Sequence, residues 1–396
     1  MAKQNTHLEH LEDDILNKGA AGGMNAIKFL RELGNMLSEP NSNVSVTTKW
    51  DGAPAVICGK HPTTGQFFVG TKGVFAKMPK ICVNNDDIDQ YYSGELAKKL
   101  KTCLKYLPKL GIQNVLQGDL LFTDDTTIRT INGERVISFQ PNTITYAVPE
   151  KSDLGQKVKT AKLGIVFHTS YSGGPTLRDM SPSFGVDVSR MQNIPGIVVF
   201  SSSFTDATGA SIFTPAQKRE YAARVNRAEG SLKQASQFLN ILGQTGDGRF
   251  LLSAMFKVYF NTYIRRGIAI ADTKKVAAGF SAYYREALDK EIALKKTEST
   301  REKYRKIQQD GLKFINANAR AIYMTVASYI NLTDAKTMVI RKLESVKDIG
   351  TYIRTDNGFR VTAPEGFVAI KSGVALKLVD RLEFSRANFT VEKNWG

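Results

Sequence analysis

The feature that most constrains the fold is a pattern of apolar residues that changes twice along the chain. From residue 45 to about residue 204, the chain consists of short β-type runs separated by turns. From Thr214 to about Lys347, apolar residues recur with the 3.6-residue period of helices, and after Asp348 the strand pattern returns. Strands that come in clusters, without regular alternation with helices, are typical of antiparallel sheets. We therefore predict an α+β fold in which an antiparallel-sheet domain carries a large all-α insertion.

The predicted domain boundaries follow these changes of pattern. Two amphipathic helices, at residues 5–17 and 24–37, are expected in an N-terminal helical segment, with the glycine-rich residues 19–23 as a break between them. The assignment is residues 1–40 for this segment, residues 41–213 and 343–396 for the sheet domain, and residues 214–342 for the helical insertion.

The expected strands are short and rich in β-branched and aromatic residues. Before the insertion they are VTTKW, AVICG, QFFVGT, VLQGDLLF, RVISFQ, TITYAV, LGIVFHTSY and GIVVFSSSF, interrupted by one helical stretch at residues 93–107. After the insertion they are TYIRT, NGFRVTA, EGFVAIKSG and VALKLVD.

The charge of the chain points to a polyanionic partner. The net charge is +16, and the insertion alone holds 24 Lys and Arg residues against 11 Asp and Glu residues. Nucleic acid is the most common partner of so basic a protein. A lysine-rich helical surface that is merely solvated stays open as the alternative, because a sequence does not show whether charges share a face.

An aromatic stripe within the insertion has two possible uses. Phe256, Tyr259, Phe260 and Tyr263 recur at the spacing of one helix face. Such a stripe can stack on bases, but at this spacing helix core is the favoured interpretation.

Other features limit the class of protein. No apolar run approaches the roughly 18 residues that a membrane span needs. The three cysteines are too few and too scattered for a disulfide framework or a structural zinc site. We expect a cytoplasmic protein with no membrane partner.

The stretch KWDG, at residues 49–52, ends a predicted strand and fits a K-x-D-G pattern that is weak evidence by itself. Four further pieces follow it along the chain: GTKGVF at residues 70–75, LQGDLLF at 116–122, PEGFVAI at 364–370 and VALKLVD at 374–380. In order and strand context, the five pieces resemble the motifs of the covalent nucleotidyltransferases, the superfamily of ATP-dependent DNA and RNA ligases and capping enzymes. The resemblance covers residues 46–170 and 358–382 and is closest to phage-type RNA ligases.

The resemblance implies that Lys49 attacks the α-phosphate of ATP and forms a covalent lysyl-AMP. A lysine amine must lose its proton to act in this way, and a partly buried site with nearby cations and Mg²⁺ favours that loss. Lys72 and Lys377 would supply positive charge to the phosphates, with Lys371 as a possible partner of Lys377.

Further site residues follow from the same resemblance. Asp119 and Glu365 would hold Mg²⁺ or Mn²⁺ or the ribose hydroxyls, since hard cations prefer carboxylate oxygens. Phe167, in preference to Phe139, would stack on adenine. The stretch around Lys49 would contribute to the nucleotide site, with Asp51 as an orienting carboxylate and Gly52 as a turn residue that lets the backbone approach; its members are Thr48, Trp50, Asp51 and Gly52.

The sequence departs from the family pattern at five points. Asp119 replaces a glutamate, and the single Lys377 stands where the family shows two lysines one residue apart. Pro54 occupies a region where RNA ligases often have an arginine. The basic helical insertion separates Asp119 from Glu365 far more widely than is usual. The 19 residues after Lys377 leave no room for the OB-fold of DNA ligases and capping enzymes, which favours an RNA-ligase-like enzyme.

We therefore expect an ATP-dependent polynucleotide ligase, phage-encoded, that transfers AMP to a 5′-phosphate end. RNA ends are the expected substrate, with DNA left open. Two alternatives remain: an adenylyltransferase that modifies a protein or small molecule, and a non-catalytic nucleic-acid-binding phage protein with a degenerate transferase core.

Overall fold

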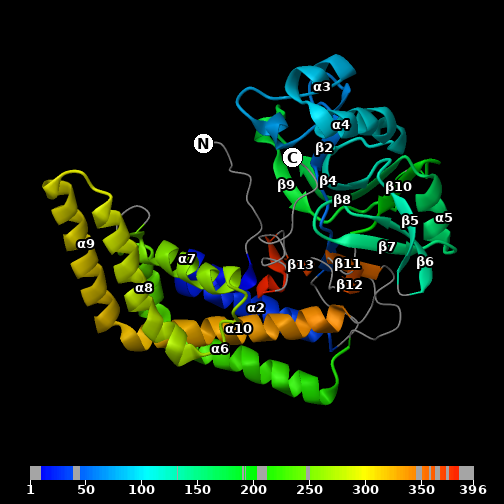
Figure 1. Ribbon diagram of the computed structural model, residues 1–396. Helices are drawn as coiled ribbons and strands as arrows, with labels where there is room; N and C mark the ends of the chain where they lie inside the picture. Colours follow the sequence, from blue (N-terminus) through cyan, green and yellow to red (C-terminus); the bar gives the residue numbers. More distant parts are fainter. Residues whose placement is uncertain are drawn as a thin grey trace.

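The computed structural model describes residues 10–38, 45–131, 133–189, 191, 193–202, 212–246, 250–344, 350–355, 358–361, 366–371 and 374–382. The fold is a mixed one with antiparallel sheets and many helices, which confirms the predicted α+β class at that level. Figure 1 shows a body of long helices beside a body built around sheets.

A six-stranded sheet forms the centre of the sheet-rich body, with strand order β10-β8-β4-β2-β3 and β9 paired to β8. Its strands are antiparallel neighbours except β8 and β10, which are parallel. The bounds are β2 (Ala55–Lys60), β3 (Phe67–Gly70), β4 (Val115–Phe122), β8 (Leu163–Ser172), β9 (Ser181–Phe184) and β10 (Ile197–Phe200).

A five-stranded sheet joins residues from both sides of the helical insertion, in the order β12-β11-β7-β6-β5. The first pair, β11 (Gly350–Thr355) and β12 (Gly358–Val361), follows the insertion, and β11 pairs with β7 (Thr145–Pro149). The remaining strands are β5 (Thr127–Ile131) and β6 (Glu134–Phe139). The chain therefore returns to the sheet-rich body after the insertion, as its residue pattern predicts.

Three helices complete the sheet-rich body: α3 (Asn85–Tyr91), α4 (Gly94–Tyr106) and α5 (Asp153–Thr160). The helix α4 buries Leu100 and Cys103 against Cys58 and Leu116 of the six-stranded sheet. All three cysteines are buried free thiols. The sequence pattern predicts α4 but misses α3 and α5, which are too short to show a clear helical period.

The helical body consists of the short 3-10 helix η1 (Leu11–Asp13) and the helices α1 (Asp14–Asn17), α2 (Gly19–Met36), α6 (Pro215–Leu242), α7 (Leu252–Arg265), α8 (Thr273–Ala293), α9 (Glu298–Ala317) and α10 (Ala319–Leu343). The inserted part of this body begins with α6 at Pro215, where the sequence pattern predicts the change to helix. Thr214 caps α6, because its hydroxyl accepts from Gln217 N while the Gln217 side chain accepts from Thr214 N. In Figure 1, α8 and α9 extend away from the sheets.

The N-terminal helices do not stand apart from the insertion. Leu30 of α2 shares one apolar core with Leu232 of α6 and Val326 of α10. The expected separate segment at residues 1–40 is therefore part of the helical body.

The predicted break between the two N-terminal helices is present but shorter than expected, because α1 ends at Asn17 and α2 already begins at Gly19 and runs through the glycines. A Cβ at Gly22 would lie 2.0 Å from the Asp14 carbonyl oxygen, and one at Gly23 would lie 2.6 Å from Leu232 Cδ1. These glycines allow close helix packing. In the sequence alone, a run of glycines resembles a helix break.

The aromatic stripe of α7 is core, as predicted. Phe256 and Phe260 are 0% and 1% exposed, and Phe256 stacks on Phe280 of α8. Among the helices that the structure describes, none has both the length and the apolar character of a membrane span.

Candidate active site

The strand that ends in Lys49 is joined to the strands that carry the last two motifs. β1 (Ser45–Lys49) pairs with β13 (Gly366–Lys371), with Lys49 opposite Gly366. β14 (Val374–Leu378) lies on the other side of β13, with Lys377 opposite Val368. Motifs from opposite ends of the chain are thus hydrogen-bonded neighbours, and β13 lies between the two bodies (Figure 1).

Lys49 and Lys377 lie on the same face of this three-stranded sheet. Residues directly opposite each other share a face, as do residues two apart on one strand, so Gly366 and Val368 connect the two lysines. Strands about 4.8 Å apart, with a rise of about 3.3 Å per residue, place the two Cα atoms about 12 Å apart. Both side chains are partly exposed. Two long lysine chains at this separation can reach one polyphosphate.

The opposite face of this sheet is buried against the helical body. Phe367 and Leu378 are 3% and 0% exposed and belong to the same apolar core as the long helices. The alternation of strand side chains therefore fixes which face carries the lysines.

Asp51 anchors the loop that follows Lys49. Its carboxylate accepts hydrogen bonds from Asn142 Nδ2 at 2.7 Å, Thr143 N at 2.7 Å and Ile144 N at 2.8 Å, and the side chain is buried. Its own amide donates to Tyr146 Oη at 2.7 Å. These contacts occupy most of the roughly four lone-pair sites of the carboxylate and hold the loop in place, while the orienting role of Asp51 toward a nucleotide stays a prediction.

Gly52 brings this loop against Asp119. A Cβ at Gly52 would lie 2.4 Å from Asp119 Cβ, so a larger residue would displace one of the two segments. Ala53 N also donates to Leu120 O at 3.0 Å, and Ala55 lies opposite Asp119 in the β2–β4 pair. The LQGDLLF stretch therefore contacts the KWDG stretch. The Asp119 side chain is 20% exposed.

His168 lies beside Asp119 and is absent from the sequence motifs. Its Nε2 atom is 3.6 Å from Asp119 Oδ1, and its Nδ1 atom is 2.8 Å from Thr169 Oγ1. The β4–β8 register shifts between Gln117 and Gly118, so His168 is the extra residue of a β-bulge. A histidine inside the otherwise apolar run GIVFHTSY was the available signal.

Lys72 lies at the same end of the six-stranded sheet. β3 ends at Gly70 opposite Ile57, and Lys72 begins the short helix η2 (Lys72–Phe75) directly afterwards. Thr71 caps η2 by accepting from Gly73 N, and Lys72 itself is exposed. The predicted phosphate-binding lysine is therefore free to reach a ligand near this edge.

Two predicted nucleotide contacts are core residues instead. Phe167 is 0% exposed and packs with Leu116 and Leu120 beneath α4, on the opposite face of the sheet from Asp119. Trp50 is 8% exposed, and its ring centroid lies 5.0 Å from Tyr146 and 5.1 Å from Phe200. Neither ring presents the open face that adenine stacking needs, because Phe167 is directed into the core from β8 and Trp50, directly after β1, packs against Tyr146 and Phe200. Phe139, the other candidate, is also buried.

The remaining predicted residues are placed only in part. The Thr48 amide donates to Ser202 O at 2.7 Å, which ties β1 to the end of β10. Lys371 ends β13 opposite Val374, with only its backbone described, and Glu365 lies outside the described residues. Within the described part of the chain, no group of three or more His, Cys, Asp or Glu side chains is arranged to hold a metal.

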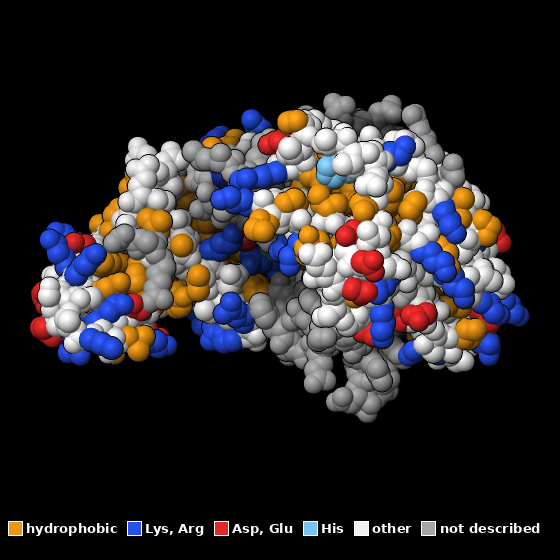
Figure 2. All heavy atoms as spheres, turned by 90° about the horizontal axis from the view of Figure 1, so that it is seen from above, with side chains coloured by type: hydrophobic (Ala, Val, Ile, Leu, Met, Phe, Trp, Pro, Cys, Tyr) orange, Lys and Arg blue, Asp and Glu red, His pale blue; other side chains and the backbone are white. Residues whose placement is uncertain are grey.

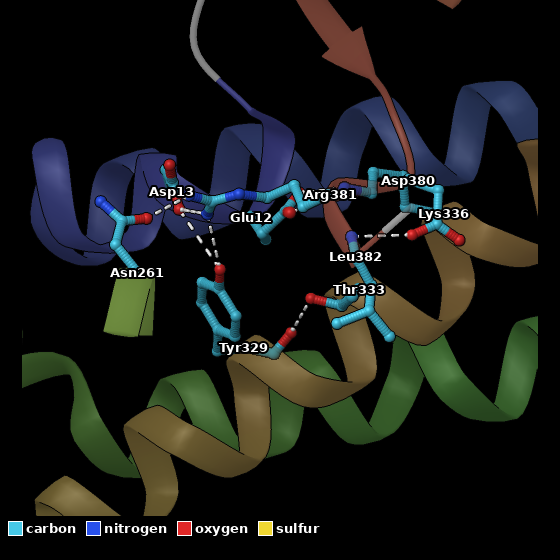
Figure 3. A network of polar contacts seen from close by, with 9 residues as sticks. All are labelled: Glu12, Asp13, Asn261, Tyr329, Thr333, Lys336, Asp380, Arg381 and Leu382. Atoms are coloured by element: carbon cyan, nitrogen blue, oxygen red, sulfur yellow. Dashed lines mark hydrogen bonds and ion pairs between the residues drawn. The ribbon is translucent and has the colours of Figure 1, made fainter. Parts of the chain in front are cut away.

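A buried polar network joins the helical body to the segment after β14 (Figure 3). Lys336 Nζ of α10 donates to both carboxylate oxygens of Glu12, at 2.7 and 2.8 Å. Arg381 donates to Asp13 Oδ1 at 2.7 Å and to Tyr329 Oη at 2.9 Å. Since Arg381 follows Lys377 by four residues, these contacts fix the end of the strand that carries this lysine.

His10 lies beside Lys377, with which it forms an isolated bridge. Burial, and then the charges of Lys336, Arg381 and Lys377, hold the pKa of His10 well below its ordinary value.

The structure is a mixed α and β protein in which the motif residues Lys49, Asp119 and Lys377 come together near the junction of two bodies. A model of DUF6267, a family of unknown function, matches residues 5–393, and the chain belongs to this family. No curated protein and no solved structure matches the chain.

Proposed function

We propose that this protein is an ATP-dependent polynucleotide ligase, with RNA ends as its substrate and Lys49 as its nucleophile. The observation that carries the proposal is the convergence of three distant segments. Lys49 and Lys377 share a sheet face, and the loop after Lys49 touches Asp119 through Gly52. Nothing in local structure requires these segments to meet, whereas phosphoryl transfer requires a nucleophile, cations and a carboxylate in one place.

The proposed reaction has three balanced steps. Lys49 Nζ, after losing its proton, bonds to the α-phosphorus of ATP while the bond to the pyrophosphate oxygen breaks. An oxygen of a 5′-phosphate end then takes the AMP and frees the lysine. Finally, a 3′-hydroxyl loses its proton and bonds to the phosphorus of the 5′-phosphate end. The bond between this phosphorus and the AMP oxygen breaks, and AMP leaves.

The other site residues act on charge in these steps. Lys377 and Lys72 stabilise the negative charge that collects on the phosphates. Asp119 would hold a divalent cation, whose charge would help to neutralise the leaving pyrophosphate.

The helical body is the candidate surface for the polynucleotide, but its charge is partly compensated. Lys295 pairs with Glu291, and Arg305 with Glu298 and Glu302. On the face drawn in Figure 2, Lys and Arg side chains are spread over the molecule in several groups. Exposed lysines such as Lys296 and Lys306 are better candidates for phosphate contacts than their paired neighbours, since their charge is open to the solvent.

The test of the proposal is covalent labelling followed by a chase. With α-labelled ATP and a divalent cation, the protein should carry label through a denaturing gel. Addition of 5′-phosphorylated RNA should remove the label from the protein and yield adenylylated, then joined, RNA. Absence of label would exclude both enzyme functions and favour a nucleic-acid-binding protein with a degenerate core. Label that neither RNA nor DNA removes would instead favour an adenylyltransferase with another target.

We expect the double variant K296Q/K306Q to bind single-stranded RNA more weakly while labelling with AMP proceeds at the wild-type rate. Each lost phosphate contact should reduce the slope of log affinity against log salt by about 0.7. Fluorescence anisotropy over a salt series measures this slope. The matched control is K151Q/K157Q, which removes two exposed lysines near α5. Equal losses in both variants would show that net charge, and not the helical body, governs binding.

A further inference from the structure

The pair Asp119 and His168 is the strongest unassigned feature of the chain. It joins a carboxylate and an imidazole on the strands β4 and β8, and both side chains are partly exposed, at 20% and 33%. Their neighbours on these strands, Leu120, Val166 and Phe167, are fully buried. Two polar groups thus open to the surface from within an apolar sheet.

We propose that Asp119 and His168 together hold a divalent transition-metal ion such as Mn²⁺. The histidine is what distinguishes this site from the all-oxygen sites that suit Mg²⁺, because imidazole is a ligand for first-row transition metals.

The separation of the two side chains fits this assignment. The distance of 3.6 Å between His168 Nε2 and Asp119 Oδ1 is too long for a good hydrogen bond. Two neighbouring ligand atoms that each lie about 2.1 Å from one metal are about 3.0 Å apart in octahedral and about 3.4 Å apart in tetrahedral coordination, and a small rotation of either side chain would close the difference. The two groups are therefore spaced as neighbours around a shared ion.

The contact on the other side of the imidazole also fits. His168 Nδ1 lies 2.8 Å from Thr169 Oγ1, and Thr169 is 3% exposed. When Nδ1–H donates to this hydroxyl, the Nε2 lone pair faces the Asp119 carboxylate. In this tautomer the two lone pairs repel each other, and a metal ion between them would remove that repulsion. Metal-bound histidines typically have such a donor contact on the second nitrogen.

The alternation of β8 explains how the sheet produces this geometry. Val166 lies opposite Asp119, and His168, two residues further along β8, is directed to the same face of the sheet. The extra residue in the β4–β8 register leaves His168 without a residue opposite it and pairs Thr169 with Gln117, two residues from Asp119 on β4.

Two protein ligands make a weak site that other ligands complete. Within the described residues no third His, Cys, Asp or Glu side chain joins the pair. Water can fill the remaining positions, and, if the proposed function holds, so can the phosphate oxygens of ATP. Binding should therefore tighten when a nucleotide is present.

The experiment uses the four histidines of the chain as reporters. In protein labelled with ¹³C at histidine Cε1, the variant H168Q assigns one of the four resonances to His168. Mn²⁺ should broaden that resonance at lower concentration than it broadens His61, which lies beyond the opposite end of β2, roughly 20 Å from the residue that pairs with Asp119. The variant D119N should need at least about tenfold more Mn²⁺ for the same broadening.

Three outcomes would overturn the proposal: broadening of His61 and His168 together, an unchanged response in D119N, or displacement of Mn²⁺ by equimolar Mg²⁺. The variant T169V keeps both ligands and should weaken binding without removing it, so a folding defect in D119N would not hide the result. Selective broadening in a protein that never labels with AMP would leave this site standing and remove only the ligase proposal. Labelling with AMP without selective broadening of His168 would leave the ligase proposal standing and remove the metal site.

Discussion

Replacement of Lys49 by alanine is expected to abolish covalent labelling from α-labelled ATP, by at least about 10³-fold, because no other group at the end of β1 can form the phosphorus–nitrogen bond. Lys49 to arginine should be equally inactive, since a guanidinium keeps its proton at any working pH. Both variants are measured on a denaturing gel at equal protein concentration.

The matched control for this variant is K60A. Lys60 ends β2, the next strand along the chain, where it is exposed and donates to Gln113 Oε1 at 2.7 Å. It should label like the wild type. Label that persists in K49A would exclude Lys49 as the nucleophile, and a loss in K60A as large as in K49A would point to a general effect of removing lysines.

Glu12 to glutamine is expected to destabilise the protein by about 3–5 kcal/mol, because it leaves the Lys336 ammonium buried without a counter-charge. Glu12 is 0% exposed and Lys336 is 1% exposed, and the two make the two short contacts described above. A fall in the urea midpoint of unfolding, followed by circular dichroism, measures the effect.

A second substitution shows whether E12Q destabilises the protein through the unpaired charge of Lys336 or through altered packing. In the double variant E12Q/K336M the unpaired charge is gone, so much of the stability should return. The surface control is E298Q, which breaks the exposed pair with Arg305 and should leave the midpoint unchanged. A double variant as unstable as E12Q alone would mean that packing, and not charge, makes Glu12 necessary.

The buried polar network around Glu12 and Asp13 also bears on the proposed chemistry. Asp13 and Arg381 connect the first helices of the chain to the segment directly after Lys377. The sequence EDD at residues 12–14 has the appearance of an exposed acidic turn, yet all three side chains are buried. Asp14 pairs with Lys18, one turn away. The cationic partners of Glu12 and Asp13 are Lys336 and Arg381, more than three hundred residues later, so no local pattern could identify them.

The fold was more predictable than the site. Strand runs such as VLQGDLLF correspond to β4 residue for residue, since β-branched and apolar residues in a short run have few alternatives. The helical block begins at Pro215 because its cap is encoded locally by Thr214 and Gln217. Failures occurred where packing overrides propensity, as at Gly22 and Gly23, whose missing side chains make room for close contacts with Asp14 and Leu232.

Of the site, the sequence by itself determined which residue types are present and in what order: a lysine at a strand end, a carboxylate on β4 and a lysine on β14. Only the tertiary structure decided which of them meet. Strand pairing placed Lys49 and Lys377 on one face and turned Phe167 into the core. It also placed His168 of β8 on the same face as Asp119 of β4, with 3.6 Å between Nε2 and Oδ1. The reason is that side-chain direction in a sheet depends on register, and register is set by partners far away in the sequence.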